Sequence, residues 1–569
     1  MNARKLNDEP SEETGLPKIG VFAACDPRID KKSRKRSKNI VKNVADSLAG
    51  EVQFTDGSPV PVVYTDLLID SEQQADKVAK HFVEEGVDVL VCVPDTWSFP
   101  QLTVISLLSH FPDDTPINFT TGNSGPKPGV VYTHATAGAI SQYGDMVHIN
   151  VGDWPDHGLE PQMSSQTKKN LVDWCYAAVT WKGLQGRRIV VFGHDSMGME
   201  TALPHVLETR NQFGIEITRL DMKLLADMVK KEAYDHAELE ELKNWLYKHA
   251  KDRIELPEDK DEERLEQSLS LYLIIRDLMD ELNAIGGGFM SQLEWGSDKR
   301  GIPLPVADIM ESLFNSTFDH NGPKPVTPFA TEADVQAILT QLFMTWLSGG
   351  QPPLFMDFRK VWEPFEIENL ADETNTTLPQ NEEWVKKGFV DGVNSGSASF
   401  NWAGQPGTDP EELMQRISFP KAVEYFFYLG NSVHFISPAG IEGIAARLAY
   451  SSLSGMFSMF WDEAETVRPP EKMTDEIVNN ANPTWPHTFI MPRHATMTEY
   501  KQYAPANHFH MTWSLETARL QYWMDLANVL SVAPWQNKPE FREGIDRPQP
   551  LLYLLNGGAK KTKMLRKKQ

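Results

Sequence analysis

Three short segments of this sequence carry residue types that could share one chemical task. Glu332 lies in PFATEAD at 328–334, Asp357 in LFMDFR at 354–359, and His508 in APANHFH at 504–510. Two carboxylates that converge repel each other unless a cation lies between them or one is protonated. Carboxylates suit Mg²⁺ or Mn²⁺, and one imidazole moves the preference towards Mn²⁺ or Co²⁺. The residue types therefore predict a divalent metal site on Glu332, Asp357 and His508.

The elements expected around these residues make a meeting plausible. Thr331 and Asp334 match a capping pattern, which places Glu332 in the first turn of a helix that ends at Leu347. Such a helix is ~24 Å long at 1.5 Å per residue. A strand of about five residues up to Asp357 runs back only ~16 Å, so the tilt of the strand and the connecting loop must supply the remaining distance to Glu332. The alternatives are structural: Glu332 only complements the helix dipole, and His508 and His510 are one inward and one outward strand residue.

Other motifs give no support for nucleophilic or nucleotide chemistry. The sequence GHDSMGM at 193–199 has its serine three residues after the first glycine, whereas a nucleophile elbow needs two. The chain contains no P-loop and no G-x-G-x-x-G, so no nucleotide cofactor is expected. The glycine run at 286–288 predicts a tight turn.

Composition excludes several classes of protein. The 569 residues include 27 Phe, 15 Trp and 14 Tyr, enough apolar surface for several cores, and no apolar run is long enough to span a bilayer. The net charge of −24 argues against nucleic acid as a partner, because such a surface repels phosphates. Only three cysteines occur, and the N-terminus does not resemble a signal peptide, so we expect a cytoplasmic protein without a membrane partner.

Apolar strands alternating with helices predict α/β architecture in the first part of the chain. Strands are expected at 18–25, 62–65, 87–94, 147–151 and 188–193, and helices at 33–48, 71–85, 200–211, 220–231, 237–250 and 263–282. Beyond about residue 352, short strands and many Gly, Pro, Asn and Trp residues indicate a mostly β domain. The predicted division is a flexible lead at 1–17, α/β domains at 18–185 and 186–350, a mostly β domain at 351–556 and a basic tail at 557–569.

The chain resembles the L-fucose isomerase family, part of the wider fucose/arabinose isomerase group. The resemblance runs from residue 18 to about residue 542 and is divergent. Its most specific matches are FNSTFDHNG at 314–322, FATEAD at 329–334, LFMDFR at 354–359, VNSGSAS at 393–399, NPTWPHTF at 482–489 and ANH at 506–508. Their occurrence in the right order makes the joint signal strong.

The resemblance implies two Rossmann-like α/β domains followed by a C-terminal domain that contains a β-barrel. It also implies a homohexamer that interconverts an aldose and a ketose through an enediol(ate), with Mn²⁺, or else Co²⁺ or Mg²⁺, as cofactor. Carried over by motif, Glu332, Asp357 and His508 are the metal ligands, and the two carboxylates are also the proton acceptors. The active site would lie between domains and include a neighbouring subunit's N-terminal domain.

The resemblance also assigns sugar-binding positions. Arg28, Trp97, Trp485 and Asn507 match family positions near the sugar, although a surface salt bridge for Arg28 and structural packing for the tryptophans are equal alternatives. Met290 and Asn431 stand where fucose-specific members carry glutamine and tyrosine, which suggests a retained reaction on a changed sugar.

The expected substrate is therefore either an L-fucose-like aldose or a diverged aldose such as sulfoquinovose, which would give the 6-deoxy-6-sulfofructose ketose. A sulfonate would need cations, for which Arg28, Lys324 and Arg359 are candidates. Two other functions stay open: a catalytically inactive sugar-binding homologue, and a metal-dependent epimerase or aldolase that uses the same ligands.

Overall fold

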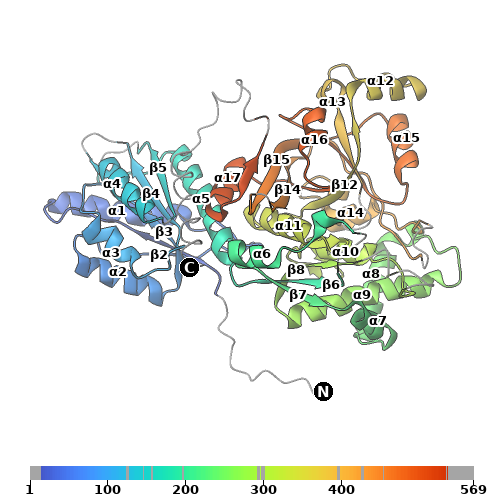
Figure 1. The fold of residues 1–569 in the computed structure, drawn as a ribbon, viewed down its shortest axis with the longest axis horizontal. Helices are drawn as coiled ribbons and strands as arrows, with labels where there is room; N and C mark the ends of the chain where they lie inside the picture. The colour runs from blue at the N-terminus through green and yellow to red at the C-terminus, as the bar shows by residue number, and fades with distance from the viewer. Residues whose placement is uncertain are drawn as a thin grey trace. The chain divides into compact units, whose positions relative to one another are not determined.

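The computed structural model describes most of the chain as two compact units (Figure 1). The described residues are 15–123, 127–144, 146–154, 158–194, 198–290, 295, 301–393, 398–423, 429–452, 454–533 and 535. Among them, the N-terminal unit comprises 15–54 and 58–186, and the second unit comprises 55–57 and the residues from 187 to 535. The predicted basic tail and the lead up to residue 14 lie outside the described residues, and the predicted domain boundaries remain predictions.

The N-terminal unit is built on a parallel sheet with strand order β2-β1-β3-β4-β5. Its strands are β1 (Lys18–Phe22), β2 (Val62–Tyr64), β3 (Val87–Cys92), β4 (Ile117–Gly122) and β5 (Val147–Gly152). Its helices are α1 (Lys31–Leu48), α2 (Glu72–Glu84), the π-helical η1 (Gln101–Ile105), α3 (Ser106–Leu108), α4 (Gly129–Tyr143) and α5 (Ser165–Gly183). An apolar core joins α2, α3 and α4 to the sheet, as expected of strands buried on both faces.

The second unit begins with another parallel sheet, in the order β11-β8-β6-β7. Its strands are β6 (Arg188–Phe192), β7 (Glu216–Leu220), β8 (Ala284–Phe289) and β11 (Phe329–Thr331), and β9 (Phe318–Asp319) and β10 (Gly322–Pro323) form a small hairpin. The helices are η2 (Glu200–Ala202), α6 (Val206–Phe213), α7 (Met222–Lys230), α8 (His236–Ala250), η3 (Lys251–Arg253), α9 (Asp261–Glu281), α10 (Asp308–Asn315) and α11 (Val335–Leu347).

Two predictions for this region were wrong. The helix expected at 200–211 is interrupted, because Pro204 disfavours helical backbone at the residue before it, and α6 begins only at Val206. The glycine run at 286–288 forms no turn but lies within β8. A Cβ atom at Gly287 would meet the Phe329 ring at 2.8 Å, and one at Gly288 would meet Ile338 Cδ1 at 2.9 Å. The run therefore lets β11 and α11 pack closely on β8.

Helix α11 connects this sheet to the rest of the unit. Every residue from Val335 to Leu347 is buried, and the helix packs against β8 and β11 on the sheet and against β14 and β17 of the barrel. Its polar side chains satisfy the backbone of β14: Thr340 Oγ1 accepts from Leu448 N at 3.0 Å, and Gln336 Oε1 accepts from Tyr450 N at 2.9 Å. The helix is therefore buried on all sides, and its apolar residues outnumber its polar ones, as expected of a helix packed between two layers.

A closed antiparallel barrel of six strands completes the second unit. Its strands are β12 (Leu354–Trp362), β13 (Phe389–Val393), β14 (Glu442–Ser451), β15 (Met456–Val467), β16 (His487–Pro492) and β17 (His508–Thr512), in the order β14-β17-β12-β13-β16-β15. Pairing of β14 with β15 closes the barrel, and β18 (Leu530–Val532) adds to β15 in parallel.

Short helices lie between and after the barrel strands in the chain: α12 (Pro364–Glu373), α13 (Glu383–Lys387), η4 (Phe400–Ala403), α14 (Pro410–Gln415), α15 (Glu471–Ala481), α16 (Met497–Tyr503) and α17 (Thr517–Ala527). The architecture confirms the predicted fold class of parallel α/β layers followed by a β-barrel. Within the described residues, no helix has both the length and the apolar character needed to cross a membrane.

Candidate active site

Glu332, Asp357 and His508 meet at one point of the second unit. The Nε2 atom of His508 lies 3.3 Å from Glu332 Oε2 and 3.4 Å from Asp357 Oδ1. Glu332 and His508 are buried, whereas the side chain of Asp357 is 31% exposed. Two carboxylates and one imidazole nitrogen therefore converge, and one of the carboxylates, that of Asp357, is accessible to small molecules.

Glu332 lies on a tight turn just after β11. Both Glu332 and Ala333 adopt left-handed backbone, with φ of 61° and 53°. The predicted cap was wrong: Asp334 is the N-cap of α11, and its carboxylate accepts a hydrogen bond from Ala337 N at 2.8 Å. Glu332 thus precedes the helix, and Ala333 N bonds to Phe289 O of β8 at 3.0 Å. Left-handed backbone in non-glycine residues is costly, and tight packing around the turn holds it in place.

Asp357 and His508 are paired on two adjacent strands of the barrel. Asp357 on β12 pairs with His508 on β17, and Asn507 Nδ2 donates a hydrogen bond to Asp357 Oδ1 at 3.0 Å. The strand expected to end near Asp357 continues to Trp362.

The expected alternation of His508 and His510 was wrong, because residues two apart on a strand point to the same face. Both imidazoles are buried against Phe355, at ring distances of 4.7 and 5.2 Å.

Two residues that no sequence motif singled out, Asp334 and Arg447, orient the His508 ring. His508 Nδ1 lies 2.7 Å from Asp334 Oδ2, and Arg447 binds both oxygens of the same carboxylate, at 2.9 and 3.1 Å. Arg447 is fully buried on β14. Asp334 belongs to the FATEAD segment at 329–334, and its position at the start of the predicted helix was a signal that could have identified it. Arg447, in the middle of the mostly apolar strand β14, had no comparable signal.

The electrostatics of the site follow from this packing. Burial opposes the charge on His508, but Asp357, Asp334 and Glu332 outweigh it and raise the pKa of His508 to about 10. Burial, together with the nearby Glu332 carboxylate, raises the pKa of Asp357 above its ordinary value. Burial also works against the ionised Asp334, yet Arg447 and His508 hold its pKa well below its usual range. The Asp334 carboxylate is therefore a fixed negative charge behind the ring.

Glu332, Asp357 and His508 are the residues expected to hold a divalent ion. Within the described residues, no group of three or more His, Cys, Asp or Glu side chains has the arrangement of a metal site. The donor atoms nonetheless suit such an ion, because one imidazole nitrogen and two carboxylate oxygens are ligands of Mn²⁺ or Co²⁺. The Nδ1 contact with Asp334 is the kind of outer contact that orients a ligating histidine.

Comparisons with known proteins decide the family. The model for the first N-terminal domain of L-fucose isomerase matches residues 16–186, and the model for the second N-terminal domain matches residues 187–349. The chain belongs to the L-fucose isomerase family. Enzymes of this family are aldose–ketose isomerases, and the chain is accordingly an intramolecular oxidoreductase of that class.

Its L-fucose isomerase relatives are distant. The enzyme of Vibrio vulnificus (strain YJ016) is 25% identical over 526 residues, covering 84% of this chain and 86% of the relative. The enzyme of Streptococcus pneumoniae (strain CGSP14) is 25% identical over 582 residues, covering 94% and 95%. The enzyme of Phocaeicola vulgatus is 26% identical over 529 residues, covering 84% and 85%.

In this L-fucose isomerase family member, two predicted sugar-binding residues lie beyond the carboxyl ends of strands in the N-terminal sheet. The strand order reverses between β1 and β3, and Arg28 and Trp97 follow these two strands. Ligands of open α/β sheets bind at such a reversal. Ser98 Oγ donates to Cys25 O at 2.9 Å and so ties the two loops together. Arg28 is mostly exposed and paired with Asp26 at 2.6 Å, and Trp97 packs edge-on against Tyr132.

The other predicted sugar-binding residues lie in the second unit. Met290 is buried and directly follows β8, whose last residue, Phe289, pairs with Thr331 of β11. Glu332 directly follows Thr331, so Met290 and Glu332 follow neighbouring strands. Asn507 contacts Asp357. Trp485 packs in an apolar cluster with Val393, which pairs with Asp357.

Three further residues are held by backbone groups. The amide of Asn431 is buried and donates to the carbonyls of Glu255 and Phe419, at 2.9 and 3.0 Å. Lys324 Nζ donates to Ser316 O at 2.7 Å, and burial lowers its pKa to about 8. Arg359 donates to Ala481 O at 3.2 Å. For Asn431 and Lys324, these contacts favour a structural role.

Proposed function

We propose that this family member is a divalent-metal-dependent aldose–ketose isomerase that acts through an enediol(ate), with Glu332, Asp357 and His508 as its centre. The observation that supports this proposal is the convergence of the Glu332 and Asp357 carboxylates on His508 Nε2. Such a cluster is expensive to bury without a function, because two like charges share a small volume.

Glu332, Asp357 and His508 would hold Mn²⁺, or else Co²⁺ or Mg²⁺, which when bound would act as a Lewis acid on the sugar's O1 and O2. One of the two carboxylates removes the proton from C2 and delivers a proton to C1, and the other moves the hydroxyl proton from O2 to O1. The buried Glu332 is held on its rigid turn, whereas Asp357 is partly exposed and receives a hydrogen bond from Asn507. Asp334 holds the His508 ring so that Nε2 stays directed at both carboxylates.

The substrate is proposed from the positions that depart from the fucose-specific pattern. An apolar Met290 beside the turn that carries Glu332, in place of glutamine, removes a hydrogen-bonding group from a position close to the reacting carbons. The buried Asn431, in place of tyrosine, removes an aromatic contact. We infer an L-fucose-like aldose or a diverged aldose such as sulfoquinovose, with the exposed Arg28 as a candidate cation for a sulfonate.

The assembly is proposed from the family. A homohexamer in the cytoplasm would bring Arg28 and Trp97 of one N-terminal unit to the metal site of a neighbour.

A substrate screen with label detection tests the function. The purified protein, its metal content measured, is incubated in D₂O with L-fucose, D-arabinose, L-arabinose, D-glucose and sulfoquinovose, and products are identified by NMR. An isomerase forms a ketose and takes deuterium from solvent at C1 or C2 without breaking a carbon–carbon bond. An inverted aldose or a shortened chain would instead identify an epimerase or an aldolase. Sugar binding without any product would identify an inactive homologue.

A further inference from the structure

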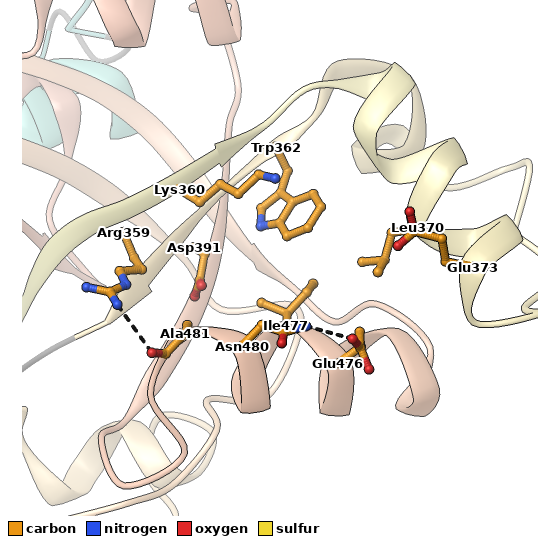
Figure 2. A pocket seen from close by; sticks show the side chains of 10 residues that line it. All are labelled: Arg359, Lys360, Trp362, Leu370, Glu373, Asp391, Glu476, Ile477, Asn480 and Ala481. Atoms are coloured by element: carbon orange, nitrogen blue, oxygen red, sulfur yellow. Dashed lines mark hydrogen bonds between the residues drawn. The ribbon is translucent and has the colours of Figure 1, made fainter. Parts of the chain in front are cut away.

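A polar pocket of about 320 Å³ lies on the barrel wall, outside the candidate active site (Figure 2). Arg359, Lys360 and Trp362 of β12 and Asp391 of β13 form one side, and Glu476 and Asn480 of α15 form the other. Among the described residues, its lining includes neither Glu332, Asp357 nor His508. No role for this pocket follows from the isomerase chemistry.

Two buried polar atoms in the pocket wall lack hydrogen-bonding partners. Trp362 Nε1 is a donor and Asp391 Oδ2 is an acceptor, and neither has a partner among the described residues. Asp391 is fully buried, and Figure 2 shows the indole nitrogen on the side of the Trp362 ring that faces Asp391. An unsatisfied buried polar atom costs about 1–3 kcal/mol, so both atoms favour a ligand or water that completes them.

The second oxygen of Asp391 is already engaged. Asp391 Oδ1 lies 3.1 Å from His487 Nδ1, and His487 Nε2 lies 2.9 Å from the carbonyl of Asn482. Both ring nitrogens of His487 thus face oxygen atoms. Asp391 has one side-chain oxygen engaged with His487, and its other oxygen is still able to accept a hydrogen bond.

The charges around the pocket select the chemistry of the ligand. Asp391, Glu373 and Glu476 line it and oppose an anion, whereas Arg359, Lys360 and the indole N–H oppose a cation. The Trp362 ring already has two neighbours: Lys360 Nζ lies over one face, 3.6 Å from the ring centre, and the Phe389 ring is stacked with it at a centroid distance of 6.1 Å. A ligand is therefore recognised at the indole edge rather than by stacking. A neutral hydroxyl group fits both unsatisfied atoms, since it accepts from an N–H and donates to a carboxylate.

We propose that this pocket is a second, non-catalytic site for a neutral polyhydroxylated molecule. One or more hydroxyl groups of that molecule accept from Trp362 Nε1 and donate to Asp391 Oδ2. The volume lies at the lower end of that of small-molecule sites, which suits a monosaccharide or a short polyol. The proposal does not depend on the isomerase function.

Isothermal titration calorimetry on the full-length protein tests the site with two probes. Xylitol represents an open polyol, and methyl α-D-glucopyranoside represents a closed sugar ring that cannot open and be isomerised. Each is titrated into the wild type and into Trp362→Phe and Asp391→Asn. Trp384→Phe is the control, because Trp384 packs in the neighbouring apolar cluster but does not line the pocket. The probe that binds more tightly identifies whether open or cyclic molecules are preferred.

We expect Trp362→Phe and Asp391→Asn to weaken binding at least tenfold, while Trp384→Phe leaves it unchanged. Glu332→Gln, which acts on the other site, should retain this binding event. If Asp391→Asn fails to fold, Trp362→Phe alone decides, because phenylalanine keeps an aromatic ring beside Phe389 and lacks the N–H, and Trp384→Phe controls for the smaller ring. Equal affinities in all variants, or no binding of either probe at millimolar concentration, would overturn the proposal and leave a water-filled pocket.

Discussion

The Asp334 carboxylate lies between two cationic groups, 2.7 Å from His508 Nδ1 and 2.9 Å from Arg447 Nη1. Its second oxygen also accepts from Arg447 Nη2 and from Ala337 N, the first-turn amide of α11. A single side chain therefore caps the central helix, neutralises a buried arginine of β14 and orients the imidazole of β17. The position of His508 Nε2 depends on this one carboxylate.

Substitution of Asp334 should separate stability from metal binding. Asp334→Asn leaves Arg447 buried without its counter-ion, which costs about 3–5 kcal/mol, and should weaken Mn²⁺ binding about 10–100-fold. The double variant Asp334→Asn/Arg447→Met should regain much of the stability but not the affinity. Mn²⁺ titration by calorimetry and urea unfolding check both, with the exposed Asp372→Asn as control. Normal Mn²⁺ affinity in the double variant would remove Asp334 from the role of orienting the ring.

Glu332→Gln should abolish turnover while the fold stays intact. The amide keeps the shape of the side chain but cannot accept a proton, so we expect kcat to fall at least ~10²-fold. Glu368→Gln, on the exposed face of α12 and outside both sites, should behave as the wild type. The measurement is kcat for the best substrate, with circular dichroism as the check on folding. Near-normal activity of Glu332→Gln would exclude Glu332 from proton transfer.

Removal of divalent ions should inactivate the protein reversibly. Chelation and dialysis should stop turnover, and Mn²⁺ should restore it, because Glu332, Asp357 and His508 are proposed to hold the ion. Binding should also stabilise the fold, by about 2.7 kcal/mol at a free concentration of 100 Kd. Thermal unfolding with and without Mn²⁺ gives a readout independent of activity. Full turnover of protein shown to be metal-free would contradict this prediction.

Gly288 should be intolerant of a side chain. A Cβ there would lie 2.9 Å from Ile338 Cδ1, 3.1 Å from Ala333 Cα and 3.2 Å from Ala330 O, and so would press on the turn that carries Glu332. We expect Gly288→Ala to destabilise the fold by about 1–3 kcal/mol and to lower kcat. Gly138→Ala is the matched control: it lies in α4 with open space around its Cβ and should stabilise by about 0.5–1 kcal/mol. Urea unfolding and kcat check both; a neutral Gly288→Ala would show that the turn can yield.

The free energy of unfolding should fall as the pH rises from 4 to 7, in part because of Asp462. Burial raises the pKa of this carboxyl to about 7, against hydrogen bonds from the amides of His494 and Ala495. The folded chain therefore binds a proton that the unfolded chain has released, and this contribution is lost as the pH rises, at up to ~1.4 kcal/mol per pH unit.

Asp462→Asn removes that titration. As the pH rises from 4 to 7, the free energy of unfolding of the variant should increase relative to that of the wild type. Above pH 7 the difference between the two should stay constant. Urea unfolding across this range measures the difference. Two curves that stay parallel from pH 4 upward would contradict the assigned ionisation.

The amino-acid sequence alone determined the layers of the fold and the chemical character of the site. Apolar strands alternating with helices predict parallel sheets, because only segments buried on both faces are apolar throughout. The motifs that contain Glu332, Asp357 and His508 likewise carry the family resemblance, and their residue types suit the proposed metal chemistry. The predicted strands at 62–65, 87–94 and 188–193 correspond to β2, β3 and β6 within a few residues.

Only the tertiary structure decided how the three residues meet. Glu332 reaches His508 from a left-handed turn outside α11, and Asp357 does so as the cross-strand partner of His508. Neither relationship can be read from local spacing, because register and turn geometry depend on distant strands. The same holds for Arg447, for the glycines of β8 and for the pocket at Trp362 and Asp391. Their roles arise from segments far apart in the chain, whose packing a local pattern does not encode.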